Sequence, residues 1–133
     1  MTNETFMITG AMGCIGAWVL RNLVQDGAKV VATDLATEPV RPRQVLSADE
    51  LAQVKFAKLD VTDLKAVRSV VEENEITHII HLAGLQVPFC RANPSLGAQV
   101  NVVGTVSSSA ALAYRQTLPL PGVPRSMRRE IAA

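Results

Sequence analysis

The chain has 133 residues, of which 48% are hydrophobic and 19% are charged, and its formal net charge at pH 7 is +1. This length allows one domain of ordinary size, and so balanced a charge gives no electrostatic basis for binding nucleic acid. Polar side chains interrupt the longest uncharged stretch, residues 92–114, so no membrane span is predicted. The two cysteines, Cys14 and Cys90, are too few for a disulfide framework, and this favours the reducing cytoplasm as the compartment.

A glycine run at residues 9–16 lies between a short apolar strand, residues 6–8, and a helix. Gly10, Gly13 and Gly16 let the backbone turn sharply, approach a pyrophosphate without a Cβ in the way, and pack the helix close to the sheet. The helix N-terminus adds unpaired N–H groups and the positive end of a dipole. The run therefore predicts a phosphate-binding loop, and the alternative is a tight turn that binds nothing. The predicted apolar stripe of the helix is Ile15, Val19, Leu23 and Val24.

A second strand, residues 29–33, ends at Asp34. At this distance from the glycines, dinucleotide-binding units place an acid that accepts hydrogen bonds from the adenosine ribose hydroxyls. A carboxylate there repels a 2′-phosphate, so NAD is favoured over NADP. Arg41 and Arg43 would favour NADP, but the sequence does not determine the path of their loop. The alternative for Asp34 is an ordinary polar strand end.

Further elements continue an alternation of strands and helices. A capping box at Ser47–Glu50 predicts a short helix, residues 54–59 a third strand, and residues 77–82 a fourth strand. Thr62 or Asp63 is expected to cap the helix between the third and fourth strands. The pattern predicts an α/β fold with a doubly wound parallel sheet, strand order 3-2-1-4 and helices on both faces. The expected apolar face of that helix consists of Leu64, Val67, Val70 and Val71.

A final helix is predicted to start at Asn93 as N-cap, with Pro94 at its first position, and to end near Tyr114. Residues 115–133 are rich in proline and arginine and are predicted to form a disordered tail rather than a nucleic-acid patch. The expected buried stripe of the helix is Leu96, Val100, Val103, Ala110 and Tyr114.

Four motifs carry a resemblance to a known family: T-G-x-x-G-x-x-G at residues 9–16, L-D-V-T-D at 59–63, H-L-A-G at 81–84 and N-V-V-G-T at 101–105. In this order and spacing, the chain resembles the NAD-dependent epimerases and dehydratases of the extended short-chain dehydrogenase/reductase family. The resemblance extends from about Phe6 to Thr105. It implies that residues 1–114 form a Rossmann-type, truncated NAD-binding domain.

The resemblance also implies which residues contact the cofactor. In the family, the side chain of the residue matching Asp60 and the next backbone N–H, here that of Val61, meet the adenine. The backbone of residues 82–84 lines the central part of the cofactor, and Asn101 is a structural and cofactor-side residue. The predicted cofactor-binding residues are Gly10, Met12, Gly13, Cys14, Ile15, Gly16, Asp34, Leu35, Asp60, Val61, Leu82, Ala83, Gly84 and Asn101.

Enzymes of this family use a Tyr-x-x-x-Lys pair as acid/base and cofactor-binding group, and this sequence contains none. Lys65 is the last lysine, and the one tyrosine, Tyr114, is followed by Arg, Gln, Thr and Leu. No catalytic residue is therefore predicted. The first hypothesis is the NAD-binding part of an enzyme that transfers hydride from nucleotide sugars or related carbinols. The alternatives are a non-catalytic dinucleotide-binding regulatory module and a non-functional fragment of a disrupted gene, truncated or frame-shifted after Thr105.

Two further expectations concern the fourth strand. Residues three apart in a strand point to opposite faces, so His78 and His81 cannot chelate one ion, and no metal site is predicted. In the order 3-2-1-4 this strand is an apolar edge, which favours pairing with another chain. We therefore expect self-association or low solubility of the isolated chain.

Overall fold

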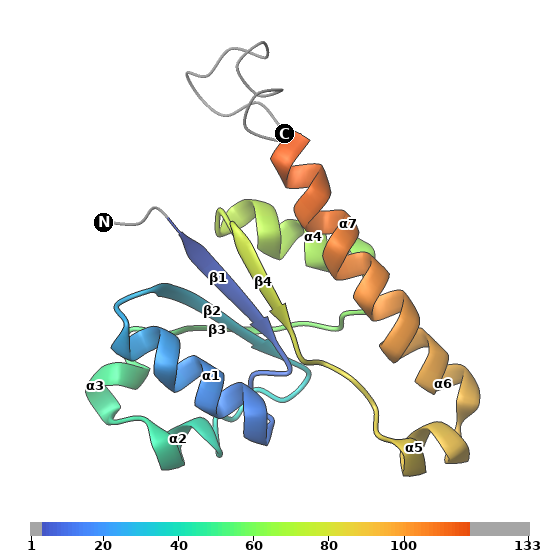
Figure 1. Ribbon diagram of the computed structural model, residues 1–133, viewed down its shortest axis with the longest axis horizontal. Coiled ribbons are helices and arrows are strands. Elements are labelled where there is room, and N and C mark those ends of the chain that lie inside the picture. The colour runs from blue at the N-terminus through green and yellow to red at the C-terminus, as the bar shows by residue number, and fades with distance from the viewer. Residues whose placement is uncertain (1–3, 118–133) are drawn as a thin grey trace.

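The computed structural model describes residues 4–117, and four parallel strands lie at its centre in the order β3-β2-β1-β4 (Figure 1). The predicted parallel sheet and its strand order are thus confirmed. The strands are β1 (Thr5–Thr9), β2 (Lys29–Asp34), β3 (Lys55–Lys58) and β4 (His78–His81). At the carboxyl end of β1, Thr9 pairs with Thr33 of β2 on one side and with His81 of β4 on the other.

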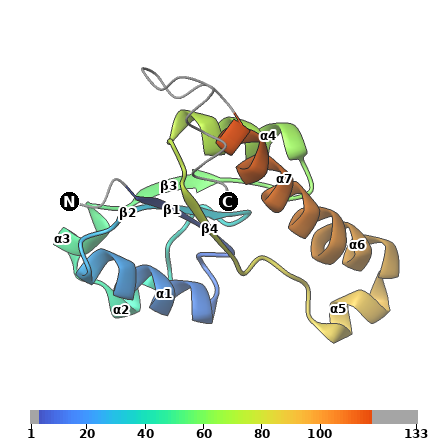
Figure 2. The same ribbon diagram turned by 45° about the horizontal axis from the view of Figure 1, so that its top comes forward.

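Helices cover both faces of this sheet. In Figure 2, α1, α2 and α3 lie on one side of the strands and α4 and α7 on the other. Among the described residues, none of the helices is long and apolar enough to cross a membrane. The helices are α1 (Cys14–Gln25), α2 (Pro42–Val45), α3 (Ala48–Leu51), α4 (Leu64–Glu73), α5 (Val87–Ala92), α6 (Pro94–Ala98), a π-helical turn η1 (Gln99–Val103) and α7 (Gly104–Thr117).

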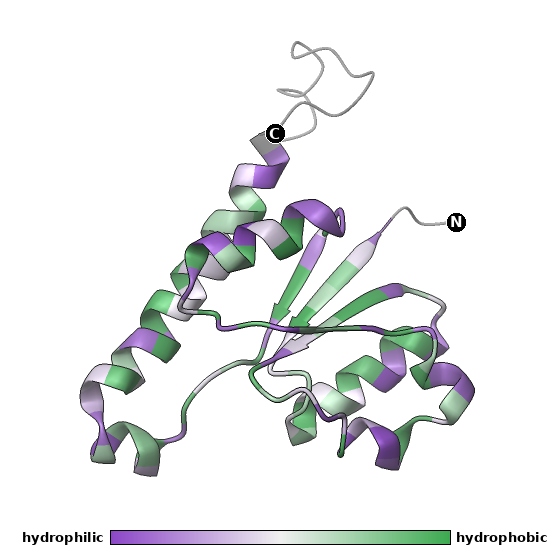
Figure 3. Ribbon diagram, turned by 180° about the vertical axis from the view of Figure 1, so that it is seen from behind, coloured by the Kyte–Doolittle hydropathy of each residue, from purple (hydrophilic) through white to green (hydrophobic). Residues whose placement is uncertain are grey.

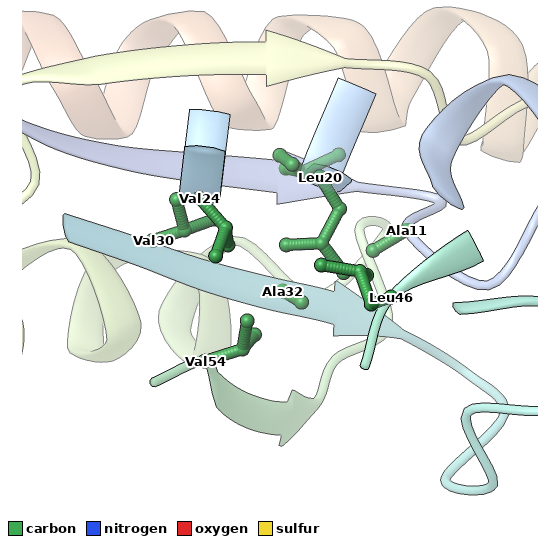
Figure 4. Close-up of a cluster of buried hydrophobic side chains, with 8 residues drawn as sticks. Ala11, Leu20, Val24, Val30, Ala32, Leu46 and Val54 are labelled. Carbon is green, nitrogen blue, oxygen red and sulfur yellow. The ribbon is translucent and has the colours of Figure 1, made fainter. Parts of the chain in front are cut away.

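Alternation along the strands divides the core into two clusters. Ile8 and Ala32 face α1, where they pack with Leu20 and other residues of the cluster drawn in Figure 4. Their neighbours Met7 and Val31 point to the opposite face and pack against α4 and α7. In Figure 3, hydrophobic colours predominate along the central strands, while one end of α4 is hydrophilic. Burial of both faces accounts for the consecutive apolar residues Met7 and Ile8 in β1 and Val30, Val31 and Ala32 in β2.

Helix caps follow the sequence signals. The Ser47 hydroxyl accepts the Glu50 N–H at 3.2 Å, and the Glu50 carboxylate accepts the Ser47 N–H at 2.7 Å, which confirms the capping box. Asp63, rather than Thr62, caps α4, and Asn93 caps α6. Each of these two side chains accepts an N–H of the first helical turn at 3.1 Å. These caps satisfy groups that the helix itself leaves unpaired.

The predicted buried stripe of α1 is partly wrong. Val24 is buried as expected, but Ile15 is 68% exposed, and the other buried positions are Gly16, Ala17 and Leu20. Because Gly16 faces the sheet, Ile15 lies about 100° around the helix and faces away. A pattern based on large apolar residues missed the small residues that allow the close approach.

The single helix predicted from Pro94 is interrupted by η1, and its predicted stripe is largely wrong. Leu96, Val103 and Tyr114 are 44%, 45% and 42% exposed. A π turn holds one extra residue, so the face turned to the sheet changes after it. The buried positions are instead Gly97, Gly104, Ser107, Ser108 and Ala111.

The end of the last described helix differs slightly from its predicted place. Helix α7 continues past the expected end at Tyr114 to Thr117. The remainder of the predicted tail, residues 118–133, lies outside the described residues.

Candidate functional site

Gly10 brings the carboxyl ends of β1 and β4 together. Its φ is +71°, a conformation that other residues rarely adopt. A Cβ on Gly10 would lie 2.8 Å from the amide nitrogen of Ala83 and 2.9 Å from the carbonyl carbon of Leu82. Because Gly10 has no side chain, the chain that leaves β1 can pack directly against the chain that leaves β4. Together they form a continuous surface at the carboxyl ends of these two strands.

The other two glycines of the run have different roles. Gly16 packs against the loop, because a Cβ there would collide with the Gly10 carbonyl oxygen and lie 2.8 Å from Cα of Ala11. Gly13 precedes α1 in an extended conformation, and the nearest atom to a Cβ built on it is the Gly10 oxygen at 3.2 Å. Gly16 thus serves helix packing, whereas Gly13 stands at the N-terminus of α1 with one close backbone neighbour.

Asp34 fastens the glycine loop to the end of β2. Its Oδ2 accepts the Met12 N–H at 3.0 Å, and its Oδ1 accepts the Ala36 N–H at 3.2 Å. A carboxylate offers about four lone-pair sites, so both oxygens retain capacity for hydroxyl donors. The partly buried carboxylate therefore lies where the loop and the second strand meet.

Asp60 follows β3 in a local turn. Its Oδ1 accepts both the hydroxyl and the backbone N–H of Thr62, at 2.7 and 2.9 Å. These two donors, the hydroxyl first, hold the pKa of the Asp60 carboxyl below its ordinary value. Val61 is buried next to it and contacts α7, where a Cβ on Gly104 would lie 2.7 Å from its Cγ2.

Asn101 in η1 supports the segment that follows β4. Its Oδ1 accepts the Leu85 N–H at 2.7 Å, and its Nδ2 donates to the Leu85 carbonyl at 3.0 Å. The same Nδ2 lies 3.5 Å from Sγ of Cys90. Asn101 thus takes the place of a strand partner for Leu85 and determines the path of the chain after Gly84.

These segments enclose a cleft of about 290 Å³ at the carboxyl ends of the strands. Most of the predicted residues line it: Gly10, Gly13, Asp34, Leu35, Asp60, Val61, Leu82, Ala83 and Gly84. The remaining five, Met12, Cys14, Ile15, Gly16 and Asn101, belong to the surrounding loop and helices and are not among the lining residues. Ligands of open parallel sheets bind at this end of the strands, where the order reverses.

Sequence reasoning missed four residues that also line the cleft, namely Thr33, Leu59, Leu85 and Val100. Thr33 and Leu59 directly precede the two aspartates, so the rule that strand ends form such sites could have identified them. Leu85 and Val100 carried no such signal, because their place depends on how η1 folds back toward β4.

The structure determines the path of the arginine loop. Arg41 donates from its guanidinium to the Met12 carbonyl at 3.4 Å, so it lies beside the glycine loop. Arg43 instead pairs with Glu38 at 3.3 Å on the surface. Asp34 and Arg41 therefore both contact Met12, one at its N–H and the other at its carbonyl.

The two histidines of β4 are bound to separate threonines. Nδ1 of His78 lies 2.8 Å from Oγ1 of Thr77, and Nδ1 of His81 lies 2.7 Å from Oγ1 of Thr9. Within residues 4–117, no group of three or more His, Cys, Asp or Glu side chains is arranged to hold a metal ion.

Sequence comparisons place these motifs in a family context. The profile of the GDP-mannose 4,6-dehydratase family matches residues 7–112. The UDP-glucose 4-epimerase of Mycolicibacterium smegmatis is 34% identical over 107 residues, which cover 79% of this chain and 33% of that protein. The UDP-glucose 4-epimerase of Drosophila melanogaster is 28% identical over 144 residues, covering 91% of this chain and 41% of that protein.

Solved structures show the same fold. UDP-glucose 4-epimerase from Thermus thermophilus, in complex with NAD, matches with a TM-score of 0.70 at 26% identity, over 84% of this chain and 34% of that one. Pen from Bacillus thuringiensis matches with a TM-score of 0.75 at 25% identity, over 86% and 36%. The chain thus spans about a third to two fifths of the length of these relatives.

Proposed function

The chain belongs to the family of GDP-mannose 4,6-dehydratase and related NAD-dependent epimerases and dehydratases, and on this premise we propose that it binds NAD in the cleft at the carboxyl ends of its strands. The observation that carries the proposal is the cleft itself, which Gly13 lines as N-cap of α1 and which Asp34 lines at the end of β2. Backbone N–H groups and a helix dipole suit a diphosphate, and a carboxylate suits ribose hydroxyls.

The residues present fit this cofactor in order along the cleft. The loop from Gly10 to Gly16 would hold the diphosphate, and Asp34 with Leu35 would meet the adenosine ribose. Asp60 and Val61 would meet the adenine, and residues 82–84 would line the central part. NAD supplies a hydride acceptor when it is bound.

Thermal unfolding of the purified chain with NAD or NADP tests the proposal. A ligand at 100 times its dissociation constant adds about 2.7 kcal/mol to the free energy of unfolding, so NAD should raise the melting temperature by several degrees. NADP should raise it less at equal concentration, because Asp34 repels the 2′-phosphate. No shift with either dinucleotide would contradict the proposed function.

Replacing Asp34 by alanine is expected to weaken NAD binding about tenfold and to reduce the preference over NADP, since the ribose loses an acceptor and the 2′-phosphate loses its repulsion. Calorimetric titration of both dinucleotides measures the two effects. Arg43→Ala serves as the control, because Arg43 pairs with Glu38 on the surface and should leave both affinities unchanged. If the ratio of the NAD affinity to the NADP affinity were the same in Asp34→Ala as in wild type, another residue would select the cofactor.

Catalysis by the whole protein is a further part of the proposal. Relatives named UDP-glucose 4-epimerase act at a sugar nucleotide, and we propose hydride transfer between a carbinol of such a substrate and NAD. The 133 residues contain no Tyr-x-x-x-Lys pair, so this chain alone should bind NAD without turnover. A non-catalytic regulatory module remains the second candidate, because it requires the same cleft and no acid/base pair. Measured turnover of a nucleotide sugar with added NAD would exclude the regulatory module, and it would also contradict the expectation that this chain alone is inactive.

We also propose that the protein resides in the cytoplasm and that it consists of an NAD-binding domain followed by a tail. Both thiols, Cys14 and Cys90, are free, which fits a reducing compartment such as the cytoplasm. The NAD-binding domain comprises residues 1–114, and the boundary to the Pro/Arg-rich tail falls near the end of α7. Limited proteolysis with and without NAD would locate that boundary.

Self-association through β4 is expected for the isolated chain. Within the described residues, β4 has β1 on one side and no strand on the other. Because the Leu82 N–H bonds to the Thr9 carbonyl of β1 and Thr9 lies opposite His81, alternation directs the backbone groups of Ile79 and His81 to the free edge. Sedimentation velocity should show concentration-dependent association, and His78→Lys should reduce it by placing a charge on the edge. A monomer at all concentrations would contradict this prediction.

A further inference from the structure

Each histidine of β4 forms a hydrogen bond with a threonine hydroxyl, but the two pairs lie at opposite ends of the strand. His78 and Thr77 meet at the amino end, and His81 and Thr9 at the carboxyl end. The residue after Thr9 is Gly10, which lines the cleft. The second pair therefore borders the candidate site, whereas the first is remote from it.

The protonation state of His81 follows from the hydrogen bonds of Thr9. The Thr9 Oγ1 accepts the N–H groups of Leu82 and Ala83, at 3.1 and 3.3 Å. A hydroxyl has two lone pairs and one proton, so both acceptor positions are occupied. The proton of the hydroxyl must then go to Nδ1 of His81, 2.7 Å away, which requires an unprotonated Nδ1. Oγ of Ser108 in α7 lies 3.3 Å from the same nitrogen.

We infer that neutral His81 is a positioning residue of the cleft, which accepts the Thr9 proton and so directs the Thr9 oxygen toward the backbone after β4. This contact holds Ala83 against Gly10, where the two strands form the floor of the cleft. The effect on the cofactor rests on the function proposed above. The arrangement of the cleft floor itself does not depend on that function.

Protonation of His81 leaves the Thr9 hydroxyl oxygen with more hydrogen-bond donors than it can accept. With a proton on Nδ1, the Thr9 oxygen would face three donors with two lone pairs, so one amide must be released. The amide of Leu82 also donates to the Thr9 carbonyl at 3.1 Å and keeps a partner. The Ala83 amide has the longer bond to Oγ1 and no second acceptor among the described residues, so competition for the two lone pairs exposes the Ala83 amide, whereas Leu82 stays bonded. Because Ala83 lies so close to Gly10, its release changes the cleft floor.

The groups that face His81 from neighbouring elements are neutral: Thr9 of β1 and Ser108 of α7. Burial lowers the pKa of His81 below its ordinary value of 6.5. The arrangement is therefore complete above about pH 6.5 and is lost as the pH falls through the lowered pKa. The other ionisable side chains on and around these elements have other positions: Glu4 precedes β1, His78 stacks on Phe6, Arg68 lies over the ring of Tyr114, and Arg115 donates to the Ile76 carbonyl. The remaining charged residues of α4 are exposed, namely Lys65, Glu72 and Glu73.

The test measures the affinity of the full chain for NAD by calorimetry between pH 5.5 and 8. The wild-type affinity should fall as the pH is lowered through the pKa of His81. His81→Asn keeps an acceptor near Nδ1 but does not titrate, so its affinity should stay within about threefold of wild type at pH 7.5 and should not change with pH. His81→Leu and Thr9→Val should bind about tenfold more weakly at pH 7.5. His78→Asn, the matched control, should behave as wild type.

Hydrogen exchange of the Ala83 amide supplies a readout that needs no cofactor and no variant. Its protection factor in the wild-type chain should fall as His81 protonates, which NMR follows on the imidazole ring. If this occurs and no NAD binds at any pH, the proposed function fails and the positioning role stands. A constant protection factor, or a His81→Asn variant with the wild-type pH dependence of NAD affinity, would overturn the positioning role.

Discussion

Replacing Gly13 by valine is expected to abolish NAD binding while the chain remains folded. The φ of −72° and ψ of 170° at Gly13 suit a β-branched residue, and a Cβ there meets the Gly10 oxygen at 3.2 Å. The side chain would instead occupy the cleft at the start of α1, where the diphosphate is proposed to bind. We expect the affinity for NAD to fall at least about 100-fold, which corresponds to 2.7 kcal/mol or more.

Calorimetry with NAD and a thermal melt of the same sample measure the effect of Gly13→Val. The variant loses a favourable N-cap residue, which costs about 1 kcal/mol of stability. Ser47→Ala removes a cap of similar value from α3, far from the cleft, and is the matched control that should bind NAD normally. Undiminished binding by Gly13→Val would exclude the glycine loop as the diphosphate site.

Replacing Gly16 by alanine is expected to destabilise the fold itself, whereas Gly13→Val is expected to act mainly on NAD binding. In an open helix, alanine is about 1 kcal/mol more favourable than glycine. Here the Cβ would collide with the Gly10 carbonyl oxygen and lie 2.8 and 2.9 Å from two backbone atoms of Ala11. Backbone atoms cannot move aside as a flexible side chain can, so the steric term dominates. We expect a loss of about 3 kcal/mol and a melting temperature lower by roughly 10 °C.

Chemical denaturation of Gly16→Ala measures this loss, and Gly13→Ala is the matched control three residues away. The control adds the same methyl group where the closest contact is 3.2 Å, so its stability should stay within about 1 kcal/mol of wild type. If Gly16→Ala were as stable as the control, the close packing of α1 on the loop would be refuted.

Local patterns predicted much of the fold correctly. The four strands, their parallel order, the capping box at Ser47 and the cap at Asn93 all agree with the structure. Each of these features is encoded in a few consecutive residues, because a buried parallel strand requires an apolar run and a helix start requires a side-chain acceptor.

Helix faces were predicted less well, because small residues carry no hydropathy signal. Gly16 and Gly104 are buried where backbone and helix approach most closely, while Ile15 and Val103 are exposed. The π turn η1 added to the error, since nothing in the sequence marked one extra residue in that turn.

By itself, the sequence determined where the glycine run, Asp34 and Asp60 stand relative to the strands, because the carboxyl ends of parallel strands form one edge. Only the tertiary structure decided that Thr9 and His81, 72 residues apart, form a hydrogen bond, and that Asn101 supports Leu85. Such contacts depend on how β1, β4 and η1 meet in space, and the spacing of residues within any one element does not specify them.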